Sequence, residues 1–228
     1  MLRSSTDLKG FEIPGCKDKV IASLFADDTA AFLSESDNLS DLLSLLHKWC
    51  QASSAKFNVE KTEIIPVGSA EYRAQVLQSH CLNPNDTGFP DSTRVLADGE
   101  SVRYLGAHIG NHTNNSEPWL PLIERIESIL DRCLEFYPTI EAKCHQVQLT
   151  IGAITQYMTQ ANGMPTHITK WLQKIQSEFL HAPINKETMS APLEQRGKKI
   201  LDLFTRNEAI HLMQLKNYLE LDPHLRGV

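Results

Sequence analysis

Two adjacent carboxylates, Asp27 and Asp28, are the residues of this 228-residue chain whose types and spacing point most directly to chemistry. Neighbouring carboxylates repel each other, so they stay ionised at low cost only when they are solvated or neutralised by a cation. A hard divalent ion with oxygen ligands, such as Mg²⁺, is the natural partner. The alternative interpretation is an ordinary hairpin with a solvated acidic turn.

The elements that must position these carboxylates are two short apolar runs, residues 20–25 and 29–33. Both runs contain β-branched or aromatic residues and are too short for a helix, which predicts strands. Asp tolerates turn geometry and bonds to its own backbone, so Asp27-Asp28 fits a tight turn between the strands. The sequence therefore predicts a hairpin with both acidic groups at its tip.

The segment Leu24-Phe25-Ala26-Asp27-Asp28-Thr29 resembles the aromatic-Ala-Asp-Asp hairpin of reverse transcriptases. Its Phe and its trailing Thr are most similar to the branch from non-LTR (LINE-type) retrotransposons. The resemblance implies a hairpin in the polymerase palm that presents metal-binding Asp side chains to the incoming nucleotide. It assigns Asp27 and Asp28 as catalytic and metal-binding residues, with Mg²⁺ or Mn²⁺ as the cofactor.

A helix is predicted from about Asp37 to Ala52, because apolar residues follow at helical spacing. The segment Ser36-Asp37-Asn38 supplies the chemistry of a helix N-cap. The apolar stripe consists of Leu39, Leu42, Leu43, Leu46, Trp49 and Cys50. We interpret this stripe as a core face.

A lysine follows this helix in the segment Asn58-Val59-Glu60-Lys61-Thr62, which resembles the Asn-x-x-Lys-Thr segment of the same family. The resemblance places Lys61 near the nucleotide phosphates. An ammonium group there neutralises developing charge or donates a proton to the leaving pyrophosphate. The alternative is a solvated lysine in a turn, because surface lysines are common.

Residues 68–98 are predicted to be a loop-rich connection with a short helix from Glu71 to His80. The segment Gly99–Gly110 alternates in polarity and fits a hairpin strand. Within it, Tyr104, Leu105 and Gly106 resemble the primer-grip strand of the family, which steadies the 3′ end of the primer. The alternative is a core strand with Gly106 at a bulge.

Three amphipathic helices are predicted next, the first starting near Pro118, the second capped by Thr139 and the third following Gly163-Met164-Pro165. They resemble the helical thumb of non-LTR reverse transcriptases. Lys143, Lys170 and Lys174 are candidate contacts to nucleic-acid phosphates, and solvated lysines on helix faces are the alternative. After a loop, a further helix is predicted from about Asp202 to Leu219.

Composition excludes several classes of protein. No apolar run approaches the about 20 residues that span a bilayer, and the N-terminus lacks the apolar core of a signal peptide. We therefore expect an intracellular protein, in the nucleus or the cytoplasm, with no membrane partner. The five cysteines form no C-x-x-C pair, so neither a zinc site nor a disulfide framework is indicated.

The net charge of −6 is unusual for a protein that binds nucleic acid. Residues 1–160 hold 13 Lys and Arg against 21 Asp and Glu, whereas residues 161–228 hold 9 against 7. Basic character thus shifts toward the C-terminal part. We expect modest, salt-sensitive affinity for nucleic acid.

These patterns predict an α+β fold: an incomplete polymerase palm, with an antiparallel β-hairpin and helices, followed by an all-helical thumb. The predicted domains are a partial palm over residues 1–110, a thumb-like domain over 111–182 and a post-thumb connection helix over 183–228. The resemblance is incomplete at the start, because two-metal phosphoryl transfer needs carboxylates from a second strand. Asp7 and Asp18 lie in polar, turn-like sequence and are not plausible substitutes. The fingers are missing too.

The main hypothesis is a fragment of an RNA-directed DNA polymerase, whose partners are an RNA template, a DNA primer and a deoxynucleoside triphosphate. The chain alone is expected to be inactive. The alternative is a non-enzymatic remnant that binds nucleic acid or another partner, and a relic reading frame or an incompletely predicted gene is a third possibility. Because strands of an incomplete palm leave unpaired edges, we expect the thumb to be the part best protected from hydrogen exchange.

Overall fold

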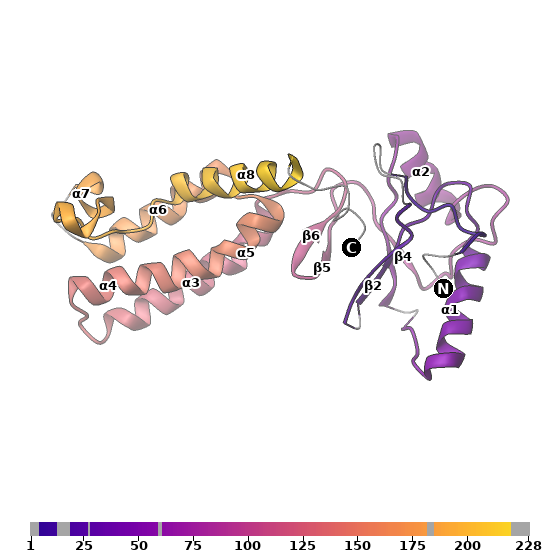
Figure 1. Ribbon diagram of the computed structural model, residues 1–228, viewed down its shortest axis with the longest axis horizontal. Coiled ribbons are helices and arrows are strands. Elements are labelled where there is room, and N and C mark those ends of the chain that lie inside the picture. Colours follow the sequence, from indigo (N-terminus) through magenta and orange to yellow (C-terminus); the bar gives the residue numbers. More distant parts are fainter. Residues whose placement is uncertain (1–4, 13–18, 27, 59–60, 182–184, 220–228) are drawn as a thin grey trace. The chain divides into compact units, whose positions relative to one another are not determined.

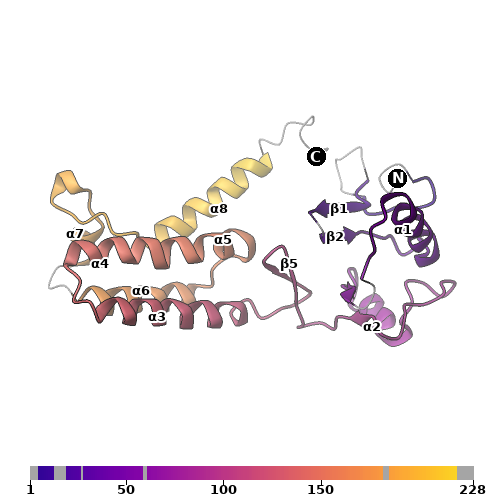
Figure 2. The same cartoon turned by 90° about the horizontal axis from the view of Figure 1, so that it is seen from below.

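The computed structural model describes residues 5–12, 19–26, 28–58, 61–181 and 185–219. Over these residues the fold is mixed α+β and mostly helical, with small two-stranded sheets and a helical C-terminal half (Figures 1 and 2). The chain divides into two compact units. Unit 1 comprises the described residues of 5–105 with 109–113, and unit 2 comprises 106–108 with the described residues of 114–219.

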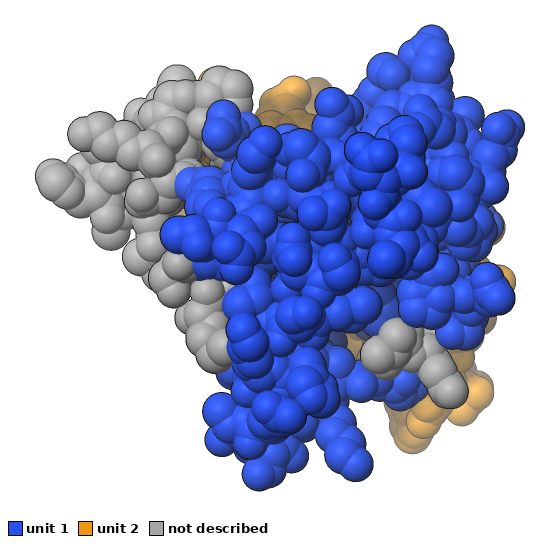
Figure 3. Space-filling view, turned by 90° about the vertical axis from the view of Figure 1, so that its right-hand side faces the viewer, with its two compact units in different colours: residues 1–105, 109–113, 221–228 blue, residues 106–108, 114–220 orange. Residues whose placement is uncertain are grey.

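Unit 1, blue in Figure 3, contains most of the strands and two helices. Its elements are β1 (Ala22–Phe25), β2 (Asp28–Ala31), α1 (Leu39–Ser53), β3 (Glu63–Ile64), α2 (Ala70–Ser79), β4 (Arg94–Val95) and β5 (Val102–Tyr104). β1 pairs antiparallel with β2, which confirms the predicted hairpin, and β3 pairs parallel with β4. Strand β5 pairs with β6 (Ala107–Ile109).

Helix α1 is capped by a residue far away in the sequence. Its N-cap residue, Asn38, makes no side-chain capping hydrogen bond. The amide of Leu39 instead donates to both carboxylate oxygens of Asp86, at 3.1 and 3.2 Å. The helix was predicted correctly, and its N-cap residue, Asn38, lies in the predicted capping segment. The Asn38 side chain accepts no capping bond, and the carboxylate of Asp86 satisfies the first amide of the helix.

The apolar stripe of α1 is only partly a core face. Leu39 and Leu42 are buried, whereas Leu43 and Trp49 are exposed. The Trp49 ring packs against Phe57, with the ring centroids 5.3 Å apart. Leu46 also packs against the core of unit 1. The interpretation of the whole stripe as a core face was therefore wrong for Leu43 and Trp49.

The core of unit 1 is small and joins segments that are distant in sequence. Its buried apolar residues are Leu8, Ile21, Leu39, Leu42, Val76, Phe89 and Val95. They come from the N-terminal segment, the start of the hairpin, α1, α2, the loop before β4 and β4 itself. The hairpin is therefore anchored at its base, by Ile21, and not at its tip.

Unit 2 is a helical bundle. Its helices are α3 (Leu120–Leu134), α4 (Ile140–Val147), α5 (Ala153–Asn162), α6 (Thr166–Leu180), α7 (Lys186–Ser190) and α8 (Leu203–Leu219). Short 3₁₀ turns lie at Glu117–Trp119 and Leu193–Gln195. The predicted helices are present, but the second is divided by a π-helical turn, Gln148–Gly152, into α4 and α5.

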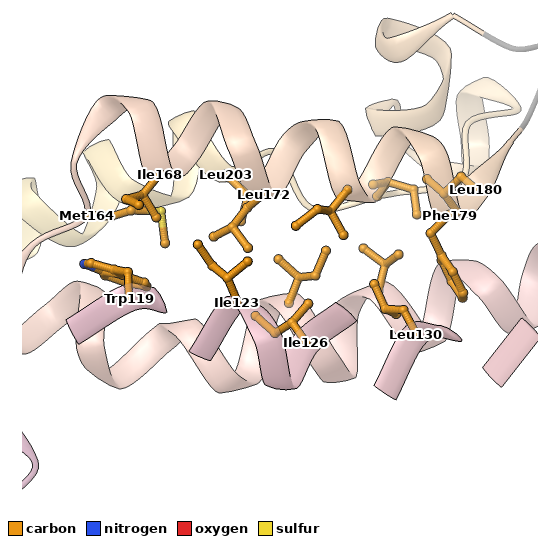
Figure 4. Close-up of a cluster of buried hydrophobic side chains, with 14 of the residues drawn as sticks. Trp119, Ile123, Ile126, Leu130, Met164, Ile168, Leu172, Phe179, Leu180 and Leu203 are labelled. Atoms are coloured by element: carbon orange, nitrogen blue, oxygen red, sulfur yellow. The ribbon is translucent and has the colours of Figure 1, made fainter. Parts of the chain in front are cut away.

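The core of unit 2 runs the length of the bundle. Figure 4 shows side chains of α3 meeting those of α6 across the helix interface. The buried cluster comprises Trp119, Ile123, Ile126, Leu130, Cys144, Val147, Ile151, Met158, Met164, Ile168, Leu172, Ile175, Phe179, Leu180, Met189, Ile200 and Leu203. The spacing of three and four residues along α3 and α6 places these side chains on one face of each helix. The last three residues fall within the stretch 183–228, so that stretch packs into the helical unit.

Among the described residues, no helix is both long and apolar enough to span a membrane.

Candidate metal and nucleic-acid site

The tip of the β1–β2 hairpin is a tight turn. Phe25 and Asp28 pair with each other, which leaves two residues for the turn. Ala26 lies in the left-handed region at φ 52°, as the favoured two-residue hairpin turns require of their first residue. Asp27, which was assigned to metal binding, lies outside the described residues. Asp28 is the first residue of β2, with an exposed side chain, so the prediction that it lies in the turn was wrong because so tight a turn has no room for it.

A buried carboxylate fixes the chain on either side of the hairpin. Asp37 is 2% exposed. Its carboxylate accepts hydrogen bonds from the amides of Lys9, Gly10 and Ser34, at 2.7, 2.9 and 2.8 Å. Since Ser34 follows the hairpin directly, Asp37 ties the N-terminal segment to the exit of the hairpin. Charge-assisted bonds of this kind are stronger than neutral ones.

The base of the hairpin packs against Gly10. This glycine has φ +67°, and a Cβ atom there would lie 2.7 Å from Ile21 Cγ1 and 2.7 Å from the Val20 carbonyl oxygen. Phe11 and Val20 exchange backbone hydrogen bonds at 2.8 Å in both directions. The close approach therefore requires glycine at position 10.

Among the described residues, Asp28 is the candidate metal ligand at this tip. Asp28 offers the hard oxygen donors that Mg²⁺ prefers. However, the described part of the chain contains no group of three His, Cys, Asp or Glu side chains that would hold a metal ion. Mg²⁺ usually takes one or two carboxylates and completes its shell with waters and substrate phosphates, so the exposed carboxylate of Asp28 fits as one of its ligands.

Lys61 lies in a short turn just before β3, and its side chain is exposed. Its amide donates to the Asn58 carbonyl at 3.2 Å. No hydrogen bond or ion pair between the Lys61 and Asp28 side chains is found in the described residues. The position of Lys61 near the nucleotide phosphates therefore stays a prediction from the resemblance.

The segment that resembles a primer grip forms a hairpin turn. Tyr104 ends β5, and Leu105 and Gly106 have φ 48° and φ 84°. Two successive positive φ values are typical of a type I′ turn between strands. A Cβ atom at Gly106 would lie 3.1 Å from Tyr157 Cε1. The alternative interpretation of a bulge at Gly106 was wrong, because the glycine is the second residue of the turn.

The three candidate phosphate contacts do not lie together. Lys170 and Lys174 are exposed and one turn apart on α6, and Lys174 is 3.7 Å from Glu178. The Lys143 ammonium lies 5.6 Å from the ring centroid of Phe179, a buried residue on the opposite side of α6. This is a cation–π contact. Of the three candidate lysines, Lys170 and Lys174 are the two that lie side by side on one exposed surface.

Sequence reasoning missed an ion pair that links α2 to the loop after β4. The Arg73 guanidinium donates to both Asp98 oxygens, at 2.8 and 2.7 Å, and also to His112 Nε2 at 3.3 Å. The hydrogen bond from Arg73 lowers the pKa of Asp98, and Asp98 raises the pKa of Arg73. This ion pair joins the two ends of the connection over residues 68–98, for which the sequence analysis predicted no contact.

A second missed feature is a polar network in unit 2. Arg206 donates to the Gly152 carbonyl at 3.2 Å, to Thr155 Oγ1 at 2.8 Å, to Thr159 Oγ1 at 3.2 Å and twice to Asn207 Oδ1, at 2.9 and 3.2 Å. All five N–H groups of the guanidinium are thereby used. Burial lowers the pKa of Arg206. Its acceptors are neutral, and it holds α8 against α5.

The sequence contains a weak indication of this network. Thr155 and Thr159 are spaced by four residues on the apolar face of a predicted helix, and both are fully buried. Buried hydroxyl groups need partners, which predicts a polar group nearby but does not identify Arg206. The π-helical turn places the Gly152 carbonyl where Arg206 reaches it.

Comparison with protein-family models found no match to this chain. Comparison with curated proteins likewise found no match.

Proposed function

We propose that this chain is the palm-hairpin, connection and thumb portion of a non-LTR retrotransposon reverse transcriptase. The observation that carries the proposal is the tight hairpin turn after Phe25, with Ala26 at positive φ and Asp28 at the start of β2. This geometry suits the Phe-Ala-Asp-Asp sequence that carries the resemblance. The order of the later elements, a helix, a type I′ hairpin and a helical bundle, agrees with the same proposal.

In the parent enzyme the reaction is RNA-templated attack of a primer 3′-hydroxyl on the α-phosphate of a deoxynucleoside triphosphate. A bound Mg²⁺ or Mn²⁺ supplies charge stabilisation at the phosphates. Asp27 and Asp28 contribute oxygen ligands, and Lys61 approaches the phosphates. Tyr104, Leu105 and Gly106 steady the primer. Lys170 and Lys174 contact backbone phosphates, with Lys143 as a third, more constrained candidate.

The chain alone is expected to be inactive, because two-metal phosphoryl transfer needs carboxylates from a second strand besides those of the hairpin. The test is primer extension on an RNA template with Mg²⁺ or Mn²⁺. We expect no synthesis. Synthesis that Asp27→Ala abolishes would overturn the proposed inactivity while supporting the family assignment.

A test that needs no activity uses Mn²⁺ as a paramagnetic probe. If the hairpin contributes ligands, added Mn²⁺ broadens the NMR signals of residues near the turn at low concentration. The broadening should be lost in Asp27→Asn/Asp28→Asn. Asp91→Asn is the control, because Asp91 is an exposed aspartate in a loop of the same unit. Equal broadening in the hairpin variant and the wild type would contradict the assignment.

A second candidate function is a non-enzymatic module that binds nucleic acid. The observation in its favour is that unit 2 has a complete core while the described metal donors are incomplete. This function predicts salt-dependent binding to an RNA–DNA hybrid that Asp27→Ala leaves unchanged. Lys170→Glu/Lys174→Glu should weaken binding. It should also reduce the slope of log K against log salt concentration by about two, because two phosphate contacts are lost. The absence of binding at low salt would exclude this function.

A further inference from the structure

Helix α8 buries side chains against the bundle in its first half, and its second half keeps a polar contact to α5. Leu203 and Asn207 are buried on this side, and farther along Gln214 Nε2 donates to the Gln160 carbonyl at 2.6 Å. From His211 to Tyr218 every side chain is exposed. In Figure 2 the second half of α8 diverges from α5. This half of the helix therefore has little packing to stabilise it.

The exposed half carries Leu212 on the face turned away from the bundle and Leu215 on the flank beside it. Leu212 is 66% exposed and Leu215 is 53% exposed. At about 100° per residue, Leu212 lies roughly 140° around the helix from Asn207, which marks the packed side. Helical segments gain most of their stability from packing an apolar face. Leu212, with Leu215 beside it, therefore provides a surface for a partner helix.

The charges around these leucines identify the partner. Glu208 and Lys216 lie four residues before and four residues after Leu212, on the same outward side of α8. In an antiparallel pair of identical helices with the two-fold axis at Leu212, Glu208 of each copy faces Lys216 of the other. A parallel pair would place like charges at the same level instead. The sequence of this face is thus complementary to itself in the antiparallel arrangement.

We propose that α8 pairs antiparallel with α8 of a second copy of this chain, centred on Leu212. The pairing does not depend on the proposed function. Lys216 also makes an interaction within its own chain, but an ammonium group has three N–H donors and serves more than one acceptor. One half-helix per copy buries less than the about 1,000 Å² of a stable interface. The dimer is therefore weak and dissociates on dilution.

The first measurement is sedimentation velocity of the full chain over about a hundredfold range of concentration, because mass action favours the dimer at the upper end. We expect a monomer at the lowest concentration and a growing dimer fraction above it. A monomer at every concentration would overturn the proposal. So would a dimer that persists unchanged in Leu212→Asp.

Met213→Asp is the matched control for Leu212→Asp. Met213 is on the same turn and is 53% exposed, but it lies about 100° away from Leu212 around the helix. Leu212→Asp should abolish the dimer, and Met213→Asp should leave it. Because both side chains are exposed in the monomer, circular dichroism of the two variants should match that of the wild type. Loss of the dimer in both variants alike would contradict the proposed face.

Charge reversal tests the antiparallel register. Glu208→Lys and Lys216→Glu alone should each weaken dimerisation roughly tenfold, because two complementary pairs become repulsive. The double variant Glu208→Lys/Lys216→Glu should recover wild-type dimerisation. A mixture of the two single variants should form heterodimers, because each copy then faces opposite charges. Failure of both the double variant and the mixture to recover dimers would overturn the antiparallel pairing.

Discussion

The two units of this chain differ in how their cores are built. Among the described residues, unit 2 has one continuous cluster of seventeen buried apolar residues, and the buried cluster of unit 1 has seven, which come from distant segments. The hairpin that carries the candidate chemistry belongs to the unit with the smaller core. Leu24 and Phe25, next to its tip, are each 63% exposed. The comparison teaches that the helical unit is closed by its own packing, whereas the hairpin is held only at its base.

In unit 1, which has the smaller core, buried polar contacts also hold the segments together. Asp37 binds three backbone amides and Asp86 caps α1. Unit 2 uses its polar network differently, because Arg206 joins helices that apolar packing has already brought together. Removal of one of these carboxylates should therefore lower the free energy of unfolding of unit 1 by more than removal of a surface charge lowers that of unit 2.

The largest expected effect is at Leu172, which is fully buried in unit 2. Leu172→Ala should lower the free energy of unfolding of this unit by about 2–5 kcal/mol, because it leaves a cavity in a closed core. Chemical denaturation followed by far-UV circular dichroism measures the change. Leu24→Ala is the matched control in the hairpin. It should change the free energy of unfolding by no more than about 0.5 kcal/mol, since that side chain is exposed. Equal losses of stability from Leu172→Ala and Leu24→Ala would contradict the difference between the two units.

The next effect is at Asp37. Asp37→Ala leaves three backbone amides without their acceptor, which should cost unit 1 about 2–3 kcal/mol. Denaturation followed by the NMR signals of unit 1 measures this loss. Asp28→Ala, which removes an exposed carboxylate, should leave stability nearly unchanged. A cost confined to unit 2 would contradict the role assigned to Asp37.

A smaller effect of opposite sign is expected at Ala26. The left-handed conformation costs a residue with a Cβ atom about 1 kcal/mol, and glycine adopts it freely. Ala26→Gly should therefore stabilise the hairpin by somewhat less than that, because glycine also gains entropy in the unfolded chain. Amide exchange in β1 and β2 measures the change. Gly99→Ala, at φ +94° in an open position, should destabilise unit 1 by a comparable amount.

The smallest effect is a dependence on pH. Because Arg73 lowers the pKa of Asp98 in the folded chain, this pair stabilises unit 1 above the unfolded pKa of about 4. The contribution is lost as pH falls through the lower folded pKa. Asp98→Asn should therefore flatten the acid dependence of unit 1 unfolding below that pH. An acid profile identical to that of the wild type would contradict the pairing.

How far the sequence predicts this molecule depends on the range of the interactions. The helices of unit 2 were predictable, because residues such as Ile123, Ile126 and Leu130 repeat at helical spacing within one segment. The hairpin was predictable from two short apolar runs and a turn. The length of its turn was not predictable, since the register of the two strands decides whether Asp28 belongs to β2 or to the turn.

The contacts that hold the candidate site in place were not predictable. Asp37 bonds to Gly10 across 27 residues, Asp86 caps Leu39 across 47, and Arg206 reaches Thr155 across 51. Each is an ordinary polar residue until the fold brings its partner close. The exposure of Leu43 and Trp49 on α1 was also missed, because helical spacing alone does not show how far a core extends.

Hydrogen exchange of the full chain, read by mass spectrometry, tests the difference between the units most directly. Slow exchange is expected in α3 and α6, where a continuous core must open, and fast exchange in β1 and β2, which form a two-stranded sheet. Unit 1 should reach full exchange while the centre of unit 2 remains protected. Equal protection of β1, β2, α3 and α6 would contradict the account, because it would mean that the hairpin is as firmly held as the bundle.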